Sequence, residues 1–291
     1  MGMDFRFGVN MVSSGSRDEW VEKCRRAEAL GYDVIGIPDH LGLPAPFPAM
    51  MLAAAATERV RLNTFVLNVP FYNPALLARD VATVDQLSGG RVELGLGAGY
   101  VEAEFEAAGI PFPSGGRRVD HVAETAATLK RLYADADYRP SPAQAGGPPL
   151  LIAGWGERML RVAAEHADIV AVTGAGTTGN GQLTLAGPSE VAGRMAYLRR
   201  LLGDRVDSVE LNLLIQALVS PGERDEARQR LAPHLPVHNT DPLEEFITLL
   251  VGTPEQMADR LRERRETYGI NYITVLEPNM EKFAPLIQLV R

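Results

Sequence analysis

The most chemically suggestive residues of the sequence are an adjacent aspartate and histidine, Asp39-His40, placed directly after the short apolar run Val34–Pro38. Such a run suits a strand buried on both faces, so the pair is expected where that strand ends. Histidine titrates close to neutral pH and is the commonest general acid–base side chain. We interpret His40 as an acid/base or substrate contact with Asp39 assisting; the alternative is a histidine that only caps its strand. The remaining histidines are expected in helices or in a proline-rich surface stretch and are given no role: His121, His166, His234 and His238.

Two glycine-rich turns carry the second chemical signal, because each is expected to follow a strand. Glycine lets the backbone approach a bound group closely, and a helix that starts after such a turn presents free N–H groups to a phosphate. The residues concerned are Gly97 and Gly99, Gly154 and Gly156, and, after the next strand, Thr173 with the loop 174–181. A helix is expected from Glu157, directly after the second turn. The alternative is that these glycines only make tight strand-to-helix turns.

Motifs of several other enzyme classes are missing from the sequence. GxSxG, GxxxxGK[ST] and HExxH do not occur, and the run 95–99 (GLGAG) lacks the GxGxxG spacing. Cys24 is the only cysteine, which excludes an internal disulfide and a cysteine-cluster metal site. Because only one histidine is expected at a strand end, a cage of histidines and carboxylates around a metal is not expected either.

Composition narrows the possible partners. The 291 residues include 29 Lys+Arg and 37 Asp+Glu, which give a net charge of −8 and argue against nucleic acid as the main partner. The N-terminus has no long apolar segment, and no run of 18 apolar residues occurs anywhere, so no membrane association is expected. The sequence therefore predicts a soluble, cytoplasmic protein that acts on a small molecule.

Apolar runs typical of strands alternate with segments of helical periodicity along the whole chain. The expected strands are Phe5–Met11, Val34–Pro38, Arg61–Asn68, Arg91–Leu96, Leu150–Ala153, Ile169–Val172, Val209–Val219 and Tyr272–Leu276. The expected helices are Arg17–Leu30, Met50–Thr57, the segment from Pro74 to Leu87, Arg117–Tyr133, Arg158–Glu165, Ser189–Leu202, Pro254–Tyr268 and Met280–Val290.

Eight such units predict an α/β fold of the (β/α)8 TIM-barrel type, as one domain over residues 1–291; a doubly wound sheet is the alternative. In a barrel of this type the active site lies at the carboxyl ends of the strands, where His40 and both glycine turns are expected. Three long loops, Pro111–Gly116, Ala134–Pro149 and Gly174–Gly187, are interpreted as rim or lid segments.

Several segments resemble the bacterial luciferase-like monooxygenase superfamily, and within it the branch that uses the 5-deazaflavin coenzyme F420. The segments are IPDH (37–40), NPALLARDVATVDQLSGGRVELGLGAGY (73–100), EFEAAGIPF (104–112), LLIAGWGERMLRVAAEHADIVAV (150–172) and GTPEQMADRLRERRETYGINYITV (252–275). The resemblance covers nearly the whole chain, and its most specific part is 87–100.

This resemblance implies a TIM barrel, a homodimer and a non-prolyl cis peptide in the third strand, which here is the bond Phe65–Val66. It implies that Asp39 and His40 face the cofactor ring and that Asn68 lies beside the ring. The residues implied for the rest of the cofactor are Gly97, Ala98 and Gly99 along its chain, and Ala153, Gly154, Trp155, Gly156 and Thr173 around its phosphate. Phe71, Tyr72, Trp155 and Phe112 are expected to wall the pocket and to favour an apolar or aromatic substrate.

Two departures from the family pattern bear on the activity. The family's sugar-phosphate dehydrogenase has a proton-donating glutamate after the GxG turn, whereas this chain has Tyr100, which argues against sugar-phosphate oxidation. Flavin-using relatives often have a serine in the turn after the fifth strand, whereas this chain has Gly154-Trp155-Gly156. That difference favours F420 over FMN.

The function implied is an oxidoreductase that transfers a hydride between F420 and a small organic substrate, with His40 as acid/base and Tyr100 and Asp39 assisting. The first alternative is an FMN-dependent monooxygenase that uses reduced flavin and oxygen. A cofactor-binding protein without turnover and a barrel hydrolase without a redox cofactor are the others.

Overall fold

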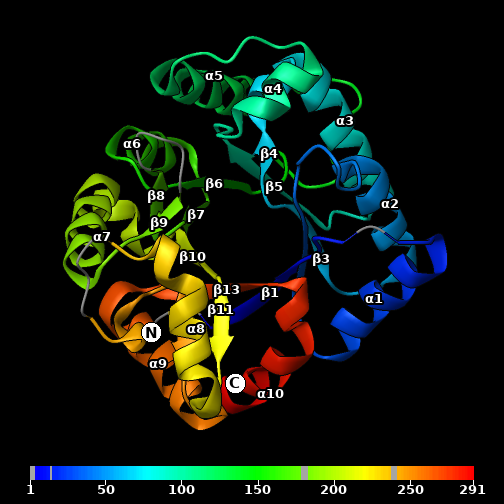
Figure 1. The fold of residues 1–291 in the computed structure, drawn as a ribbon. Helices are drawn as coiled ribbons and strands as arrows, with labels where there is room; N and C mark the ends of the chain where they lie inside the picture. The colour runs from blue at the N-terminus through cyan, green and yellow to red at the C-terminus, as the bar shows by residue number, and fades with distance from the viewer. Residues whose placement is uncertain (1–3, 14, 178–182, 237–240) are drawn as a thin grey trace.

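The strands of the chain close into a ring with helices around it (Figure 1). A computed structural model describes residues 4–13, 15–177, 183–236 and 241–291. Within them, one sheet has the strand order β3-β2-β1-β13-β10-β7-β6-β5-β4, and an additional pairing of β3 with β5 closes it. Because β3 and β4 are two parts of one interrupted strand, the ring has the eight parallel strands predicted from the sequence. The (β/α)8 prediction is confirmed.

The strand segments of the ring are β1 (Arg6–Asn10), β2 (Val34–Ile37), β3 (Arg61–Thr64), β4 (Leu67–Asn68), β5 (Val92–Gly97), β6 (Leu150–Gly154), β7 (Ile169–Val172), β10 (Glu210–Ile215) and β13 (Ile270–Leu276). Two small pairs lie outside the ring, antiparallel β8 (Ala175–Thr177) with β9 (Leu183–Leu185) and parallel β11 (Ala217–Val219) with β12 (Leu249–Val251).

The helices are α1 (Arg17–Ala29), α2 (Pro46–Ala56), α3 (Pro74–Leu87), α4 (Glu102–Ala108), α5 (Gly115–Tyr133), α6 (Glu157–His166), α7 (Pro188–Leu202), α8 (Arg224–Leu231), α9 (Pro254–Tyr268) and α10 (Met280–Val290). Short 3-10 turns are η1 (Val69–Phe71), η2 (Gly203–Asp207), η3 (Pro221–Glu223), η4 (Ala232–His234), η5 (Leu243–Glu245) and η6 (Glu277–Asn279). None of the helices in the described ranges is both long and apolar enough to cross a bilayer.

Strand β1 shows how alternation between bulky apolar residues and small or polar residues builds the two faces of the barrel wall. Phe7 and Val9 are fully buried on its outer face, where the ring of Phe7 lies 5.8 Å from that of Phe283 in α10. Gly8 faces the opposite way, and a Cβ added there would lie 3.1 Å from the hydroxyl oxygen of Thr274 on β13. Bulky apolar residues therefore pack under the helices, while small and polar residues face the barrel interior.

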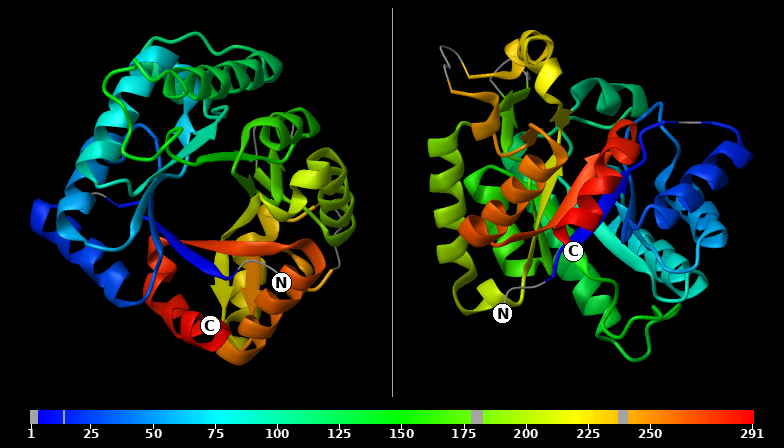
Figure 2. Two further views of the ribbon diagram at one scale, coloured as in Figure 1. Left: turned by 180° about the vertical axis from the view of Figure 1, so that it is seen from behind. Right: turned by 90° about the horizontal axis from the view of Figure 1, so that it is seen from below.

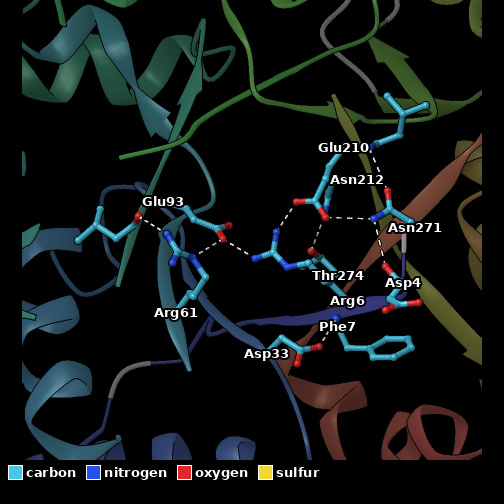
Figure 3. Close-up of polar contacts among 12 residues, drawn as sticks. Asp4, Arg6, Phe7, Asp33, Arg61, Glu93, Glu210, Asn212, Asn271 and Thr274 are labelled. Carbon is cyan, nitrogen blue, oxygen red and sulfur yellow. Dashed lines mark hydrogen bonds and ion pairs between the residues drawn. The ribbon is translucent and has the colours of Figure 1, made fainter. Parts of the chain in front are cut away.

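A network of charged side chains fills the lower end of the barrel (Figure 3). The guanidinium of Arg6 on β1 pairs with Glu93 on β5 and with Glu210 on β10, and Arg61 on β3 donates to the same Glu93 carboxylate at 2.6 Å. Asn271 donates to Glu210 at 3.0 Å. The network links strands from opposite sides of the ring at their amino-terminal ends, so charged side chains occupy that end of the barrel interior.

The third strand is interrupted between Thr64 and Leu67, and the cis peptide expected at Phe65–Val66 is present there. At the break, the Thr64 hydroxyl accepts from the Gly95 N–H and donates to the Gly95 carbonyl oxygen, both at 2.9 Å. The Thr64 side chain thus takes the place of the backbone hydrogen bonds that would join the two strands here. It holds β3 to β5 where the backbone of Phe65 and Val66 bulges into the barrel.

The expectation that Ala134–Pro149 lies at the rim or forms a lid is wrong. The segment joins α5 to β6, so it returns the chain to the start of a strand; Gln144 within it donates to the carbonyl oxygen of Val92 at 2.8 Å. In the right panel of Figure 2 the segment lies at the lower end of the barrel, away from α8 at the upper end. Connections from helix to strand belong on that side of a barrel.

Two element boundaries also differ from expectation, and two helices were not expected. The helix predicted from Met50 begins at Pro46, because proline fits the first turn of a helix as well as a loop. The strand predicted over Val209–Val219 splits at Gln216, whose N–H donates to Thr248 at 2.8 Å as the chain leaves the barrel to pair with β12. Helices α4 and α8 were not anticipated.

Candidate active site

His40 and Glu104 form the polar centre at the carboxyl ends of the strands. His40 follows β2, and its Nδ1 lies 2.7 Å from Oε1 of Glu104 on α4, the short helix after β5. The Glu104 side chain is only 14% exposed, whereas that of His40 is 36% exposed. Because a carboxylate can only accept, this contact assigns the hydrogen to Nδ1 and leaves Nε2 as the nitrogen available to a substrate.

Asp39 contributes to the architecture of the site rather than standing free beside His40. Its carboxylate accepts from the Asn68 N–H at 2.9 Å and from the Tyr72 hydroxyl. Burial raises the pKa of Asp39 although these two donors and His40 oppose the effect. Burial, together with the neighbouring Asp39, raises the pKa of Tyr72 well above its ordinary value. Asp39 therefore ties the end of β2 to the end of β4.

Tyr100 stands against His40, with ring centroids 6.0 Å apart and the rings edge to face. Burial and the nearby Glu104 raise the pKa of Tyr100, so its phenol stays protonated and can only donate or accept a hydrogen bond at neutral pH. Tyr100 as a whole residue is nevertheless 61% exposed. Tyr100 and His40 thus share one accessible face of the site.

The turn after β5 passes close to the bulge of the third strand. A Cβ on Gly97 would lie 2.6 Å from Cγ2 of Val66, and one on Gly99 would lie 2.1 Å from Oδ1 of Asn68. Gly99 also has a φ of +67°, which only glycine adopts easily. These glycines, with Ala98 between them, bring the turn against the Phe65–Asn68 segment.

The turn after β6 divides into residues that face the barrel and residues that do not. Ala153 packs in the interior cluster that includes Phe65 and Val66. Trp155 is turned outward, is only 7% exposed, and donates its indole N–H to Glu190 of α7 at 2.6 Å. Its indole N–H is therefore engaged by α7, and the expectation that Trp155 walls the pocket stays a prediction.

Gly154, Gly156 and Thr173 have different surroundings. A Cβ on Gly154 would lie 2.3 Å from Cγ of Met159, so any larger residue here would displace the Met159 side chain. Gly156 has open space around the position of a Cβ and precedes the ten-residue helix α6, which has no side-chain cap. Thr173 donates its hydroxyl to the Ala175 carbonyl oxygen at 3.0 Å. Residues 178–181 of the loop 174–181 lie outside the described residues, as does His238.

The arrangement fits a flavin-type cofactor with a phosphate on two counts. The uncapped N-terminus of α6, reached over the open space at Gly156, presents free N–H groups suited to an anion. Asn10 and Asn68, at the ends of β1 and β4, have buried Oδ1 atoms without a hydrogen-bond partner. Buried acceptors of this kind are ordinarily satisfied, so a ligand N–H or hydroxyl is a suitable partner for each.

The other expected pocket walls mostly pack on one another. Phe105 is fully buried, and the rings of Phe71 and Phe112 lie 4.8 and 4.9 Å from it. The guanidinium of Arg118 covers Phe112 at 4.0 Å from the ring centroid and donates to the Gly99 carbonyl oxygen at 3.0 Å. This aromatic cluster supports the Gly97–Tyr100 turn from behind.

Glu104 is the residue that sequence reasoning missed. Its signal lay in the segment EAEFEAA (102–108), whose glutamates at 102, 104 and 106 look alike in sequence. Only the structure shows that Phe105 anchors the helix in the core and that Glu104 is the one directed to His40.

Glu277, at the end of β13, anchors the segment after β1 and gives a test of stability. It accepts from the N–H groups of Val12 and Ser13 and from the Ser13 hydroxyl, and pairs with Lys23 at 2.8 Å. Burial alone would raise the pKa of Glu277, but these contacts outweigh it and lower the pKa below its ordinary value of 4.5.

We expect Glu277→Gln to lower the free energy of unfolding by about 1–2 kcal/mol at pH 7. A carboxylate with a lowered pKa stabilises the fold above its unfolded-state pKa, and that stabilisation is lost as the pH falls through the lower folded value. The difference between wild type and variant should therefore shrink below about pH 4.5. Urea unfolding from pH 7 to pH 3 measures this, with the exposed Glu226→Gln as control; a difference that grows on acidification would contradict it.

Comparison with known proteins places this geometry in a family. A family model described as luciferase-like monooxygenase matches residues 3–271. An F420-dependent glucose-6-phosphate dehydrogenase of Intrasporangium calvum is 38% identical over 128 residues, which are 40% of this chain and 38% of that protein. The matched region thus spans less than two thirds of that curated relative.

Solved structures share the fold over nearly the whole chain. The coenzyme F420-dependent tetrahydromethanopterin reductase of Methanopyrus kandleri superposes with a TM-score of 0.77 and 19% identity, covering 98% of this chain and 97% of that one. An F420-dependent secondary alcohol dehydrogenase in complex with an F420-acetone adduct gives a TM-score of 0.73 and 20% identity, covering 99% and 98%. Together with the family match over most of its length, the barrel shows that the chain belongs to the luciferase-like monooxygenase family.

Proposed function

We propose that this protein is an oxidoreductase that transfers a hydride between coenzyme F420 and a small organic substrate. The observation that carries the proposal is the His40–Glu104 pair, which engages Nδ1 and leaves Nε2 of the imidazole available at the carboxyl ends of the strands. Dependence on F420 in the names of the curated relative and of both structural neighbours supports this choice of cofactor.

The proposed cofactor contacts follow the strand ends in order. The Phe65–Val66 bulge, Asn68 and Gly97–Gly99 would support the ring and its chain, and Ala153, Gly156 and Thr173 with the first turn of α6 would hold the phosphate. A deazaflavin supplies two-electron hydride chemistry when it is bound. The protein must then position the substrate and provide a proton.

His40 is the proposed acid/base. With its hydrogen on Nδ1 held by Glu104, Nε2 can take a proton from a substrate hydroxyl, and the imidazolium that results is stabilised by the carboxylate. The reverse transfer delivers the proton when the substrate is reduced. Tyr100 is placed to donate a hydrogen bond on the same face, and Asp39 holds the strand ends that carry the site.

The assembly is part of the proposal and rests on the family resemblance. We expect one domain and a homodimer, and the exposed Leu76 and Leu87 on α3 are apolar surface that a partner subunit could cover. Sedimentation velocity would test the dimer.

Glu104→Ala should lower kcat by about 10- to 100-fold, because the imidazole loses the partner that fixes its tautomer and orientation. Glu104→Gln keeps an acceptor for Nδ1–H and should recover much of the loss. Nitrogen NMR of the His40 ring checks the cause, since the alanine variant should show mixed tautomers. Glu106→Ala, on an exposed position of the same helix, is the control. An unchanged His40 spectrum in Glu104→Ala would rule out the positioning role.

Binding of F420 and of FMN to the purified protein, compared by fluorescence quenching, tests the proposal directly. We expect micromolar or tighter binding of F420 and negligible binding of FMN. The reverse preference would favour the alternative, a flavin-dependent monooxygenase, which the family match makes the second candidate. Binding of neither would refute both.

A further inference from the structure

The proposed cofactor contacts take up one half of the ring of strands. They run from the interrupted strand β3–β4 through β5 and β6 to the end of β7, and these strands are consecutive neighbours in the ring. The remaining neighbours are β10, β13, β1 and β2. We call the carboxyl ends of these four strands the second half. His40 follows β2, so the proposed acid/base belongs to the second half.

Alternation along β10 and β13 identifies the side chains of the second half that face the barrel interior. The amide of Asn212 donates to the hydroxyl of Thr274 at 2.8 Å, across neighbouring strands on their inner face (Figure 3). Leu214 and Leu276 each lie two positions further along, so they face the same way, one layer nearer to the carboxyl ends.

The burial of the two strands agrees with this arrangement. Leu213, Ile215 and Val275 point outward and are fully buried in the main hydrophobic core, whereas Leu214 and Leu276 are only partly buried. A side chain on the inner face can meet solvent only inside the barrel, and the charged network occupies the opposite end. The two leucines therefore form an apolar floor that is reached from the carboxyl ends of the strands.

Asn10 adds a hydrogen-bond acceptor next to this floor. It lies beside Leu276 in the parallel register of β1 and β13, two residues beyond the inward-facing Gly8. The Phe65 carbonyl oxygen can only accept, so the atom of Asn10 that lies 3.4 Å from it is Nδ2. Oδ1 is therefore the other end of the amide, and no donor within the described ranges reaches it.

The surroundings of this acceptor suit a ligand. A Cβ on Gly36 of β2 would lie 3.1 Å from Oδ1 of Asn10, so a side chain there would crowd the acceptor and glycine does not. Buried acceptors are ordinarily satisfied, and the proposed cofactor contacts lie on the other half of the ring. The group that satisfies Oδ1 is then a hydroxyl or N–H of the substrate.

We infer that the second half binds a substrate whose apolar body rests on Leu214 and Leu276 and whose hydroxyl or N–H group, separate from the reacting group, donates to Oδ1 of Asn10. This inference rests on the proposed function, in which the reacting group meets Nε2 of His40. An analogue without the donor leaves a buried acceptor unpaired, which costs more than the missing bond alone. The site therefore selects substrates that carry a second donor.

A matched pair of uncharged ligands tests the acceptor. Trans-1,4-cyclohexanediol and trans-4-fluorocyclohexanol share a ring and one hydroxyl, and differ by a second hydroxyl against a fluorine that cannot donate. We expect the F420-loaded protein to bind the diol at least about fivefold more tightly, as measured by saturation-transfer NMR, although the fluoro compound is the more apolar of the two. Equal or tighter binding of the fluoro compound, or no binding of the diol, would overturn the inference.

Two variants of Asn10 separate its acceptor from its amide N–H. Asn10→Leu and Asn10→Asp both remove the N–H group that meets the Phe65 carbonyl oxygen, but aspartate keeps an acceptor oxygen. The preference for the diol should disappear in Asn10→Leu and persist in Asn10→Asp. A preference that survives in Asn10→Leu, or that is lost in both variants, would overturn the assignment of the acceptor to the substrate.

Variants of the floor test the apolar contact. Leu276→Ser and Leu214→Ser should each weaken binding of both ligands by about fivefold or more, while the F420 affinity equals that of wild type. Leu289→Ser, at an exposed leucine of α10, is the matched control and should change neither. If both floor variants bind the two ligands like wild type, the second half is not the substrate site.

The proposed function and the substrate class can fail separately. F420 binding is measured first for every protein, without either ligand. If F420 does not bind, the ligand pair is measured on the protein alone, because Asn10, Leu214 and Leu276 belong to the chain. A preference for the diol without F420 binding would refute the proposed function and retain the substrate class. Binding of F420 without a preference for the diol would do the reverse.

Discussion

His40→Ala should lower kcat by about 10²- to 10⁴-fold, the range that a positioned general acid–base contributes. The proposed cofactor contacts lie on the segments from β3 to the end of β7 and not on the imidazole, so the affinity for F420 should stay within about threefold of wild type. His40 is partly exposed, so the free energy of unfolding should change little. The measurement is steady-state turnover, with F420 binding by fluorescence quenching in parallel.

His166→Ala is the matched control, because His166 lies in the last turn of α6, at the opposite end of that helix from the proposed phosphate site. Its kcat should equal that of wild type. If His40→Ala also retained wild-type kcat, the proton would have to come from another group, and Tyr100→Phe would then be the variant to measure. A loss confined to F420 affinity would instead make His40 a cofactor ligand.

The ring of strands could be predicted because parallel barrel strands are buried on both faces and appear as short apolar runs. VIGI at β2 and IVAV at β7 are wholly buried, and both were recognised from this feature alone. The small strand pairs that lie outside the ring could not be predicted. β12 is the three-residue segment LLV, and its pairing with β11 depends on a contact between positions about 30 residues apart.

The site was harder to predict than the fold, because the sequence does not show in which direction each side chain points. Trp155 stands in the expected turn, but whether its indole faces the barrel or α7 depends on Glu190, which is 35 residues away. Glu104 lay unrecognised among similar glutamates because its role depends on α4, which the sequence did not reveal. His40 and Tyr100 could be singled out because each directly follows a strand or its glycine turn. Positions fixed by a strand end are therefore predictable, whereas partners brought by loops are not.

Gly95→Ala is the substitution with the largest expected effect on stability. A Cβ at this position would lie 1.9 Å from the carbonyl oxygen of Thr64 and 3.0 Å from Cγ1 of Val66. The first atom belongs to the backbone, so no side-chain rotation can relieve the overlap, and β3 would have to move away from β5. We expect the free energy of unfolding to fall by about 3 kcal/mol or more, as in overpacked cores.

The same displacement should weaken F420 binding, because the segment that must move leads directly into the Phe65–Val66 bulge proposed to support the ring. Urea unfolding and fluorescence quenching measure the two effects on one protein. Gly193→Ala is the control: its Cβ meets nothing within 4 Å on the exposed side of α7, and alanine should stabilise that helix by about 0.5–1 kcal/mol. A Gly95→Ala protein as stable as wild type would show that β3 and β5 are not held as closely as the Thr64 hydroxyl bonds require. If stability fell while F420 affinity did not, the bulge would be a structural element of the barrel rather than a support for the cofactor.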